Sequence, residues 1–340
     1  MNFNEIMKNL LANKKERWLV TGAAGFIGSH IAECLLKNNQ IVHTLDNFAT
    51  GKKENIEYLF DVQKEFGGEL SFFESDITNP ADLPAAFNGV TKVIHQAALG
   101  SVPRSIEEPA DSHAANVTGF INILNESRNN NIKRVVYASS SSVYGDSQEL
   151  PKFEDHVGKV LSPYAATKMC NEIYADSYVS CYDMTMVGLR YFNVFGPRQD
   201  PNGPYAAVIP KWIDAVQQGE SCLINGDGET SRDFCYIYNV VYANIASALI
   251  EEMPKKHEVF NIACGDKTTL NELYKLISEN VLALNLAETV KDPEYRDFRV
   301  GDIKHSLADI SKAKAVIDFK PIVNVSEGMK DTVKAYFNIK

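Results

Sequence analysis

Short apolar runs rich in β-branched and aromatic residues alternate along this chain with segments that have helical periodicity. The runs are RWLVTG, IVHTLD, LSFFESD, KVIHQAA, RVVYASS, MTMVGLRYFN and EVFNIA. Strands that alternate with helices join into a parallel sheet through right-handed crossovers. The pattern predicts an α/β fold, a Rossmann-like doubly wound parallel sheet of about seven strands, which binds ligands at the carboxyl ends of its strands.

The regular alternation ends near Asn193, where loops rich in glycine and proline begin, such as FGPRQDPNGP and INGDGETSRDF. We predict a nucleotide-binding domain over residues 1–192 and a smaller substrate-binding domain over residues 193–340. Residues 237–263 are predicted to pack back onto the first domain. The segment before the first strand has the pattern of an amphipathic helix without chemistry of its own.

Composition narrows the choice of partner. The 340 residues are 45% hydrophobic and 23% charged, which is ordinary for a globular protein with one large core or two closely joined domains. The formal net charge is −10, and no basic stripe with interleaved aromatic residues is present. Nucleic acid is therefore not an expected partner, and a small molecule is.

The six cysteines lie far apart, with no C-x-x-C motif and no nearby histidine pair. This spacing predicts neither a metal site nor a disulfide framework, and it indicates thiols in a reducing compartment. The N-terminal segment carries charges throughout, and no apolar run approaches the ~20 residues that span a bilayer. We therefore expect a cytoplasmic protein without a membrane partner.

A glycine-rich turn follows the first predicted strand. In TGAAGFIGSH, Gly22, Gly25 and Gly28 are spaced three apart, and a helix is predicted to begin at about Phe26. Glycines let the backbone approach a pyrophosphate closely, and the helix N-terminus offers free N–H groups to it. The second strand ends in Asp46, where a carboxylate would bond an adenosine ribose and repel a 2′-phosphate. The motif favours NAD over NADP; a plain tight turn and a carboxylate that caps DNFATG are the structural alternatives.

In SPYAATK, Tyr164 precedes Lys168 by four residues, which places the two side chains on one face of a helix. An ammonium there could lower the phenol pKa from its usual ~10, as a general base near neutral pH requires. Spacing alone does not decide this, because Tyr336 and Lys340 share it. Unlike that pair, Tyr164 has four serines, residues 139–142, at the end of the strand RVVYASS beside it in the same predicted sheet. This constellation predicts an acid–base site.

Together, TGAAGFIGSH, HQAALGS, ASSSSVYG, the Tyr164/Lys168 pair and RYFNVFGPRQDP resemble an extended short-chain dehydrogenase/reductase. The resemblance is to nucleotide-sugar 4-epimerases of the UDP-galactose/UDP-N-acetylglucosamine type, and it covers nearly all of residues 17–320. QAALGSVPRSI and NGDGETSRDFCYI resemble the branch that acts on N-acetylated hexosamines, including uronic-acid forms. The resemblance implies an NAD-dependent isomerase and a homodimer that pairs the helix of Tyr164 with one from about Ser112 to Arg128. Inward packing of the apolar stripes of these helices is the alternative.

The resemblance also implies a mechanism. Tyr164, as phenolate, would take the proton of the sugar 4-hydroxyl while a hydride passes from C4 to a tightly retained NAD. Lys168 would hold the nicotinamide ribose and lower the phenol pKa. Ser140 would bond the same sugar oxygen, with Ser142 nearby. The residues implied for the cofactor are Gly22, Gly25, Phe26, Ile27, Gly28, Asp46, Asn47, Asp76, Ile77, Gln96, Ala97, Ala98, Tyr164 and Lys168.

Most of the UDP-sugar contacts implied by the resemblance come from the second half of the chain. Asn193 would meet a phosphate, Ala207, Val208 and Trp212 would flank the uridine, and Asp302 would bond its ribose. Asn225, Arg232 and Arg299 would bind the UDP, and arginine suits a diphosphate through its bidentate geometry. Core packing for Trp212 and a surface ion pair between Arg232 and Asp233 are the structural alternatives. The full set is Gly100, Ser101, Ser140, Ser142, Tyr164, Asn193, Ala207, Val208, Trp212, Asn225, Arg232, Arg299, Asp302 and Ser306.

Ser306 is expected to set the sugar preference. It aligns with a hexose-pocket position that is a tyrosine in epimerases confined to non-acetylated sugars, so a serine leaves room for a C2 acetamido group. Gly100 and Ser101 are expected to line the same region. Alternatively, Ser306 caps the following helix, although Asp309 is the better N-cap candidate. We therefore expect UDP-N-acetylglucosamine and UDP-N-acetylgalactosamine to be interconverted, with UDP-glucose and UDP-galactose turned over less well.

Other activities of the same fold remain alternatives. A nucleotide-sugar 4,6-dehydratase would carry an Asp-Glu pair where this chain has Ser140 to Ser142. A decarboxylase of uronic acids would need its own carboxylate or arginine pattern, for which the sequence makes no case. A dinucleotide-sensing protein without catalysis would be expected to lack Tyr164, which is present.

Overall fold

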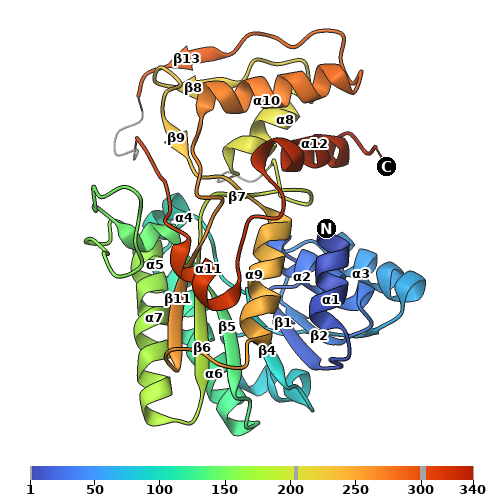
Figure 1. Ribbon diagram of the computed structural model, residues 1–340, viewed down its shortest axis with the longest axis vertical. Helices are drawn as coiled ribbons and strands as arrows, with labels where there is room; N and C mark the ends of the chain where they lie inside the picture. Colours follow the sequence, from blue (N-terminus) through green and yellow to red (C-terminus); the bar gives the residue numbers. More distant parts are fainter. Residues whose placement is uncertain (1, 203–205, 299–303, 340) are drawn as a thin grey trace.

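The computed structural model describes residues 2–202, 206–298 and 304–339. Its centre is a seven-stranded sheet in the order β11-β6-β5-β4-β1-β2-β3, in the lower part of Figure 1. Every pair of neighbouring strands in it is parallel, which confirms the predicted fold class. The strands are β1 (Arg17–Thr21), β2 (Ile41–Asp46), β3 (Glu69–Glu74), β4 (Lys92–His95), β5 (Arg134–Ser140), β6 (Thr185–Tyr191) and β11 (His257–Ile262).

The strand order reverses between β1 and β4. From β1 the chain builds outward through β2 to β3, and it then returns to β4 on the other side of β1 and continues to β5 and β6. Helices that leave β1 and β4 therefore diverge to opposite sides, which opens a crevice beyond the carboxyl ends of these two strands. This is the position at which a doubly wound sheet binds its ligand.

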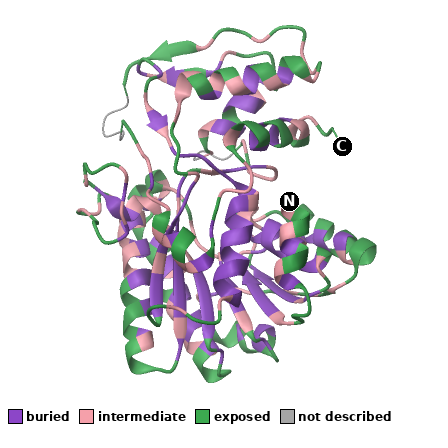
Figure 2. Ribbon diagram, in the orientation of Figure 1, coloured by how far each residue is buried: buried purple, intermediate pink, exposed green. Residues whose placement is uncertain are grey.

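Helices cover both faces of the sheet. On one face α2, α3 and α9 contribute to the larger hydrophobic core, and on the other α6 and α7 contribute to a second core. Figure 2 shows that most strands between these layers are largely buried, as their continuous apolar runs predict, whereas the edge strand β3 is partly exposed. The helices of this part are α1 (Phe3–Leu11), α2 (Phe26–Lys37), α3 (Lys53–Phe66), α4 (Val102–Glu107), α5 (Pro109–His113), α6 (Gly119–Asn129), α7 (Pro163–Cys181), α9 (Ile237–Leu249) and α11 (Ser311–Ile317). The short helical turns are η1 (Pro80–Asp82), η2 (Pro84–Phe87), η3 (Ala114–Thr118) and η4 (Ser141–Tyr144).

The helix expected from about Ser112 to Arg128 is longer than predicted. Helix α5 continues into α6 through η3, which has π-helical hydrogen bonding.

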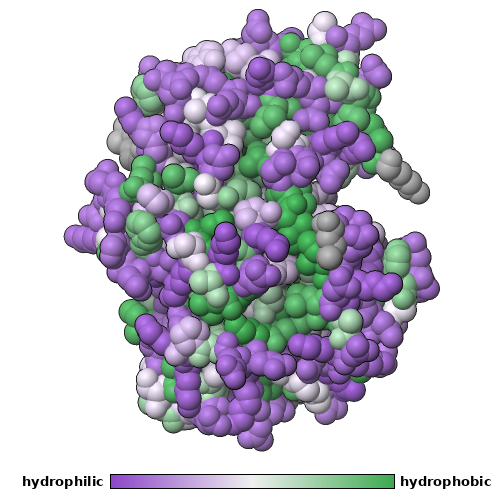
Figure 3. All heavy atoms as spheres, viewed as in Figure 1, coloured by the Kyte–Doolittle hydropathy of each residue, from purple (hydrophilic) through white to green (hydrophobic). Residues whose placement is uncertain are grey.

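Figure 3 shows hydrophobic residues in a band through the middle of one face, where Figure 1 places α9, while hydrophilic residues cover the periphery.

Smaller elements form the upper lobe in Figure 1. Three two-stranded pairings hold it together, one of them antiparallel, and helices pack beside them. The paired strands are β7 (Val194–Phe195) with β10 (Cys235–Tyr236), β8 (Leu223–Asn225) with β13 (Glu294–Arg296), and β9 (Ser231–Arg232) with β12 (Thr268–Thr269). The helices are α8 (Val208–Gln217), α10 (Leu270–Ala283) and α12 (Val325–Tyr336). After β10 the chain returns to the large sheet as α9 and β11. The division at residue 193 stays a prediction.

Helix α1 is amphipathic, as its sequence pattern predicts. Asn2 and Glu5 form a capping box at its start, and Met7 and Leu11 are buried. The ring of Phe3 stacks on that of Tyr238 in α9, with centroids 4.2 Å apart. In the described part of the chain, no helix combines the length and the apolar character that crossing a bilayer requires.

Candidate functional site

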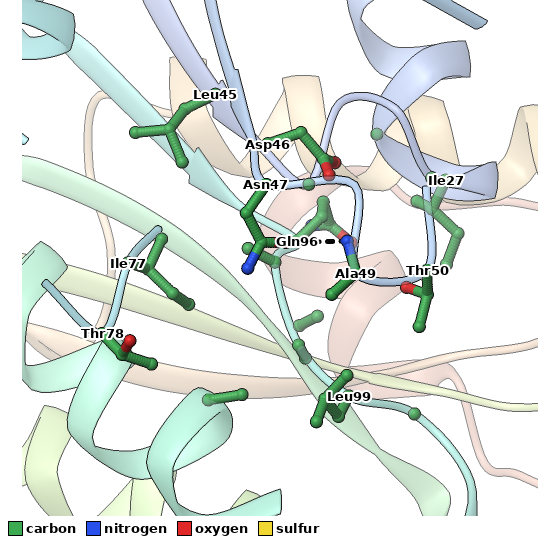
Figure 4. A pocket seen from close by; sticks show the side chains of 18 of the residues that line it. Ile27, Leu45, Asp46, Asn47, Ala49, Thr50, Ile77, Thr78, Gln96 and Leu99 are labelled. Carbon is green, nitrogen blue, oxygen red and sulfur yellow. Dashed lines mark hydrogen bonds between the residues drawn. The ribbon is translucent and has the colours of Figure 1, made fainter. Parts of the chain in front are cut away.

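A cavity of about 540 Å³ opens at the carboxyl edge of the large sheet, at the reversal point between β1 and β4. Every residue predicted to bind the cofactor lines it. Figure 4 shows Asp46 and Asn47 at the end of β2, with Ile77 and Thr78 on one side of the cavity and Ile27 on the other. The sequence prediction therefore found one coherent site. Whether these residues bind a dinucleotide stays a prediction.

The glycine-rich turn forms one wall of the cavity, and it leaves no room for a side chain at Gly22 or Gly28. Gly22 has a φ of +70°, and a Cβ on it would lie 2.7 Å from the backbone nitrogen of Ala97. A Cβ on Gly28 would lie 2.2 Å from the carbonyl oxygen of Gly22. Helix α2 begins at Phe26, as predicted, and its N-cap Gly25 supplies no side-chain hydrogen bond. The first-turn N–H groups face a ligand position, so this cradle fits the pyrophosphate of NAD.

Asp46 lies behind the cradle with 7% of its surface exposed. Its carboxylate accepts hydrogen bonds from the backbone N–H of Ala24 at 2.9 Å and of Phe48 at 2.8 Å. Burial raises the pKa of this carboxyl, and the backbone N–H groups oppose that rise. The carboxylate therefore does hold the turn in DNFATG, and it lines the cavity as well. Capping the turn and binding a ribose are compatible roles for one carboxylate, because each oxygen accepts more than one hydrogen bond.

We expect Asp46→Ala to weaken retention of NAD and to improve binding of NADP, because the variant loses both a ribose partner and a charge that repels a 2′-phosphate. Asp46→Asn is the matched control, because an amide oxygen still accepts a backbone N–H while the charge is gone. It should bind NADP better than the parent and hold NAD better than Asp46→Ala. Dinucleotide released on denaturation and titration of the refilled protein measure both effects. A parent protein that prefers NADP would refute the assignment.

Tyr164 and Lys168 both reach the cavity from the first turns of α7. Ser162 caps this helix by accepting from the N–H of Ala165 at 3.1 Å, which fixes where the helix begins. The Ser140 hydroxyl hydrogen-bonds the Tyr164 phenol, and it also accepts a hydrogen bond from the Ser142 hydroxyl at 2.9 Å. The predicted catalytic set is therefore assembled around one phenol.

The Lys168 ammonium bonds a backbone carbonyl and not the Tyr164 phenol. The Lys168 Nζ donates to the carbonyl oxygen of Ala138 at 3.0 Å and lies 6.0 Å from the centroid of the Tyr164 ring. Burial raises the pKa of Tyr164, and only the Ser140 hydroxyl lowers it. Burial also lowers the pKa of Lys168 to about 8. Because the ammonium is directed at the Ala138 carbonyl, its effect on the phenol pKa stays a prediction.

Tyr336, which shares the Tyr–Lys spacing, lies far from this constellation. Its hydroxyl donates to the carbonyl oxygen of Gln199, and burial raises its pKa. Lys340 lies outside the described residues. The phenol of Tyr336 therefore ties α12 to the loop after β7, which is a structural role.

The sequence reasoning missed several residues that line the cavity. Most of them directly follow or precede strand ends that were recognised, so their position was the available signal. Those from α5 and η3 had no sequence signal, because only tertiary packing brings that helix to the cavity. The missed residues are Leu45, Ala49, Thr50, Ser75, Thr78, Leu99, Asp111, Ala114, Ala115, Ala138, Ser139 and Tyr191.

Of the residues predicted to bind the UDP-sugar, Gly100 and Tyr164 line the cavity. Ser101 follows directly with a φ of +100° and accepts a hydrogen bond from the N–H of Arg104 at 3.2 Å. Asn193 is exposed just after β6, and its side-chain amide donates to the carbonyl of Asp233 at 3.1 Å. The ligand roles of all these residues stay predictions.

The structure bears on the structural alternatives for Trp212 and Arg232. Trp212 is 4% exposed and its indole N–H donates to the carbonyl of Leu223 at 3.3 Å, so the side chain packs in the core as the structural alternative held. Asp233 is fully buried and accepts backbone N–H groups from Cys264, Gly265 and Ala308, so no surface ion pair with Arg232 can form there. Burial raises the pKa of Asp233 to about 7.

Other predicted substrate residues are spread over the upper lobe. Ala207 is the N-cap of α8 and Val208 its first residue, while Asn225 ends β8. The guanidinium of Arg232 donates to the carbonyl of Ser231 at 3.0 Å. Arg299 and Asp302 lie outside the described residues.

Ser306 donates its backbone N–H to the carbonyl of Ser231 at 3.1 Å, and its side chain is half-buried. The predicted N-cap Asp309 is displaced by one position, because Ile310 is the N-cap of α11 and Asp309 accepts from the N–H of Ser311 instead. Ser306 does not cap this helix. Among the described residues, no group of three or more His, Cys, Asp or Glu side chains is arranged to hold a metal ion.

Relatives of known description match almost the whole chain. Residues 18–263 match the model of the NAD dependent epimerase/dehydratase family. A UDP-glucose 4-epimerase of Mycolicibacterium smegmatis is 34% identical over 95% of this chain and 99% of its own. A UDP-N-acetyl-alpha-D-glucosaminuronate decarboxylase of Bacillus cytotoxicus is 32% identical over 96% of this chain and 99% of its own.

Solved structures agree with these relatives. A UDP-N-acetylglucosamine 4-epimerase from Methanobrevibacter ruminantium, in complex with UDP-N-acetylmuramic acid, is 42% identical with a TM-score of 0.86 over 96% of this chain and 99% of its own. The UDP-glucose 4-epimerase of Thermus thermophilus in complex with NAD is 33% identical with a TM-score of 0.80 over 95% and 99% of the two chains. Family match, fold and cradle agree on NAD as the cofactor and on a nucleotide sugar as the ligand class. The chain therefore belongs to the NAD dependent epimerase/dehydratase family, within the extended short-chain dehydrogenase/reductases that epimerise UDP-hexoses at C4.

Proposed function

We propose that this protein interconverts UDP-N-acetylglucosamine and UDP-N-acetylgalactosamine by inverting C4, and that it turns over UDP-glucose and UDP-galactose less well. The observation that carries the proposal is that Tyr164 and Lys168 line the cavity whose glycine wall fits a dinucleotide, with the Ser140 hydroxyl bonded to the Tyr164 phenol. Acid–base side chains and a redox cofactor site in one cavity suit reversible oxidation of an alcohol.

Each residue has a defined task in this proposal. Bound NAD supplies the hydride acceptor and donor for sugar C4. Tyr164 takes the proton of the 4-hydroxyl and returns it after the ketone has turned, with Ser140 bonding the same oxygen. Lys168 binds the nicotinamide ribose and brings its positive charge to the site. Asp46 and the first turn of α2 hold the adenosine ribose and the pyrophosphate.

The preference for an acetamido sugar is supported by room beside the catalytic set. A Cβ placed on Gly100 would have no neighbour within 4 Å, so the space next to this backbone is open. A serine at position 306 leaves more space than the tyrosine found there in epimerases of non-acetylated sugars. The similarity to a UDP-N-acetylglucosamine 4-epimerase at 42% identity supports the same preference. Uronic-acid forms of these sugars are further candidate substrates.

The rival activities receive less support from the site. A 4,6-dehydratase needs an acid and a base to remove the 6-hydroxyl, and the end of β5 offers only serine hydroxyls there. Loss of the C6 carboxylate from a uronic acid is the second candidate activity, because one of the relatives, at 32% identity, is a decarboxylase. A dinucleotide sensor without catalysis gains nothing from Tyr164 and Ser140 in hydrogen-bonding contact.

One experiment separates these possibilities. The absorbance spectrum and the denatured supernatant of the purified protein report retained NAD. Incubation with UDP-N-acetylglucosamine, UDP-glucose and UDP-N-acetylglucosaminuronic acid in separate reactions, followed by NMR, identifies C4 epimers, 4-keto-6-deoxy sugars or released carbon dioxide. C4 epimers formed fastest from the acetylated sugar support the proposal. A 4-keto-6-deoxy product, a decarboxylated pentose or no turnover at all would each refute it.

We further propose a homodimer through the exposed faces of α6 and α7. Ile173 and Tyr174 on α7 are 60% and 38% exposed, which is unusual for large apolar side chains in the middle of a long helix.

Ile173→Glu should therefore convert the dimer to a monomer, because a charge cannot be buried unpaired in a helix interface. Light scattering after size exclusion measures the mass. Leu282→Glu on α10, where the parent side chain is 41% exposed, is the control and should leave the mass unchanged. A parent that is already monomeric would exclude the dimer.

For its location we propose the cytoplasm, where a reducing environment keeps thiols unpaired. All six cysteines are free thiols in this structure. Cell fractionation with an antibody against the protein tests this proposal directly.

A further inference from the structure

The floor of the cavity carries a buried ion pair that the proposed mechanism does not use. Ser139, at the end of β5, lines the cavity and donates its hydroxyl to a carboxylate oxygen of Glu172 at 2.5 Å. The same carboxylate accepts two hydrogen bonds from Arg190, one from its Nε at 2.9 Å and one from a terminal guanidinium nitrogen at 2.7 Å. The side chains of Glu172 and Arg190 are only 8% and 5% exposed. This Ser139–Glu172–Arg190 cluster joins α7, β5 and β6 at one point.

The cluster adjoins Lys168 along α7 and Ser140 along β5. Glu172 follows Lys168 by one helical turn on α7, and Lys168 Nζ bonds the carbonyl of Ala138 at 3.0 Å. Two successive turns of α7 are therefore hydrogen-bonded to two successive residues of β5, Ala138 and Ser139. Fixing Ser139 against α7 fixes the end of β5, from which the next residue, Ser140, reaches the Tyr164 phenol.

Arg190 extends the cluster beyond the cavity floor. Its remaining terminal nitrogen donates to the carbonyl of Glu154 at 2.8 Å, and its guanidinium lies over the ring of Tyr144 at 4.9 Å. The carboxylate of Glu154 accepts the backbone N–H of Asn261 at 2.9 Å in β11. Each of the three guanidinium nitrogens thus donates a hydrogen bond, and the loop after η4 is fixed to the sheet by the same side chain.

We infer that Ser139, Glu172 and Arg190 are positioning residues, which set the distance between Ser140 at the end of β5 and Tyr164 on α7. A buried ion pair adds little net stability compared with apolar side chains of the same volume, since both charges lose their hydration. Its directional bonds specify geometry instead, and general-base catalysis depends on the distance between the base and its partner. The inference rests on the UDP-sugar epimerisation proposed above and adds residues that position its catalytic groups.

The test uses Ser139→Ala, Glu172→Gln and the double variant in the full-length holoenzyme. Ser139→Ala removes one hydroxyl and leaves the ion pair in place, so it should fold. We expect it to lower kcat by about 10- to 100-fold, the scale of a misplaced catalytic group, with KM and retained NAD changed less than about twofold. The double variant should lose no more than Glu172→Gln alone, because both changes break the same contact.

Glu258→Gln is the matched control. Glu258 lies on β11 of the same sheet, is 4% exposed and pairs with Lys312 at 2.9 Å, away from the cavity. It should lower the melting temperature and leave kcat unchanged. The inference is overturned if Ser139→Ala keeps the parent kcat, if the losses of the two single variants multiply in the double variant, or if kcat follows the melting temperature across all four proteins.

The measurement distinguishes this inference from the proposed sugar preference. Kinetics are run on whichever UDP-sugar pair the parent protein turns over, so a wrong sugar assignment leaves the comparison intact. A crystal structure of Ser139→Ala decides the point without turnover. In it the Ser140 hydroxyl should leave hydrogen-bonding distance of the Tyr164 phenol, and an unmoved Ser140 would overturn the inference.

Discussion

Tyr164→Phe is expected to lower kcat by about 10²–10⁴-fold, the range that general-base catalysis contributes. The phenol is the group in the cavity that can accept the 4-hydroxyl proton, and a phenyl ring keeps its shape without the oxygen. UDP-sugar binding and retained NAD should stay close to the parent values, since the lost interaction is made with the reacting oxygen. Steady-state kinetics and isothermal titration with the UDP-sugar measure the two effects separately.

Tyr336→Phe is the natural control for this variant. Tyr336 has the same spacing to a following lysine, but its hydroxyl bonds the carbonyl of Gln199 and lies outside the cavity. Its removal should affect the melting temperature and leave kcat within about twofold of the parent, because one hydrogen bond contributes ~1 kcal/mol to stability. Unchanged turnover in Tyr164→Phe would show that another group is the base.

Ser306→Tyr is expected to remove activity on the acetylated sugars and to spare the smaller ones. A phenol added at the proposed hexose wall would overlap a C2 acetamido group, and a side chain that overlaps one substrate costs only that substrate. We expect the ratio of kcat/KM between the acetylated and the non-acetylated pair to fall by about 100-fold, which corresponds to ~2.7 kcal/mol of selective repulsion. The values of kcat/KM for both sugar pairs are measured on the same preparations of the parent and of the variant.

Ser306→Ala serves as its control, because it keeps the space open and removes only a hydroxyl. It should retain the parent ratio. The backbone N–H of residue 306, which bonds the carbonyl of Ser231, is the same in both variants, so folding of the segment should not differ. Equal losses on both sugar pairs in Ser306→Tyr would show that residue 306 is not the gate.

The central sheet was predictable because each of its strands carries its own signal. A strand buried on both faces has a continuous apolar run, and the crossover rule then joins the runs into one parallel order. The cofactor side of the site followed from the same signal, since Gly22, Asp46 and Asp76 stand at strand ends and all strand ends share one edge.

The upper lobe was less predictable because its strands are only two or three residues long and their pairing depends on distant partners. Nothing in the local sequence of Trp212 separates a core indole from one that stacks on a base, and packing decided for the core. The Ser139–Glu172–Arg190 cluster was invisible for the same reason, since its members come from three elements. The pKa of Tyr164 depended on where the Lys168 ammonium points, which helical spacing does not specify.

The return of the chain to the large sheet has a consequence for biosynthesis. Strand β6 ends at Tyr191, but its second neighbour β11 begins only at His257, after much of the upper lobe has been made. A nascent chain that has emerged only to the end of β6 presents an open apolar strand edge, the kind of surface that pairs with other chains. The sheet is therefore completed only after most of the upper lobe has been synthesised.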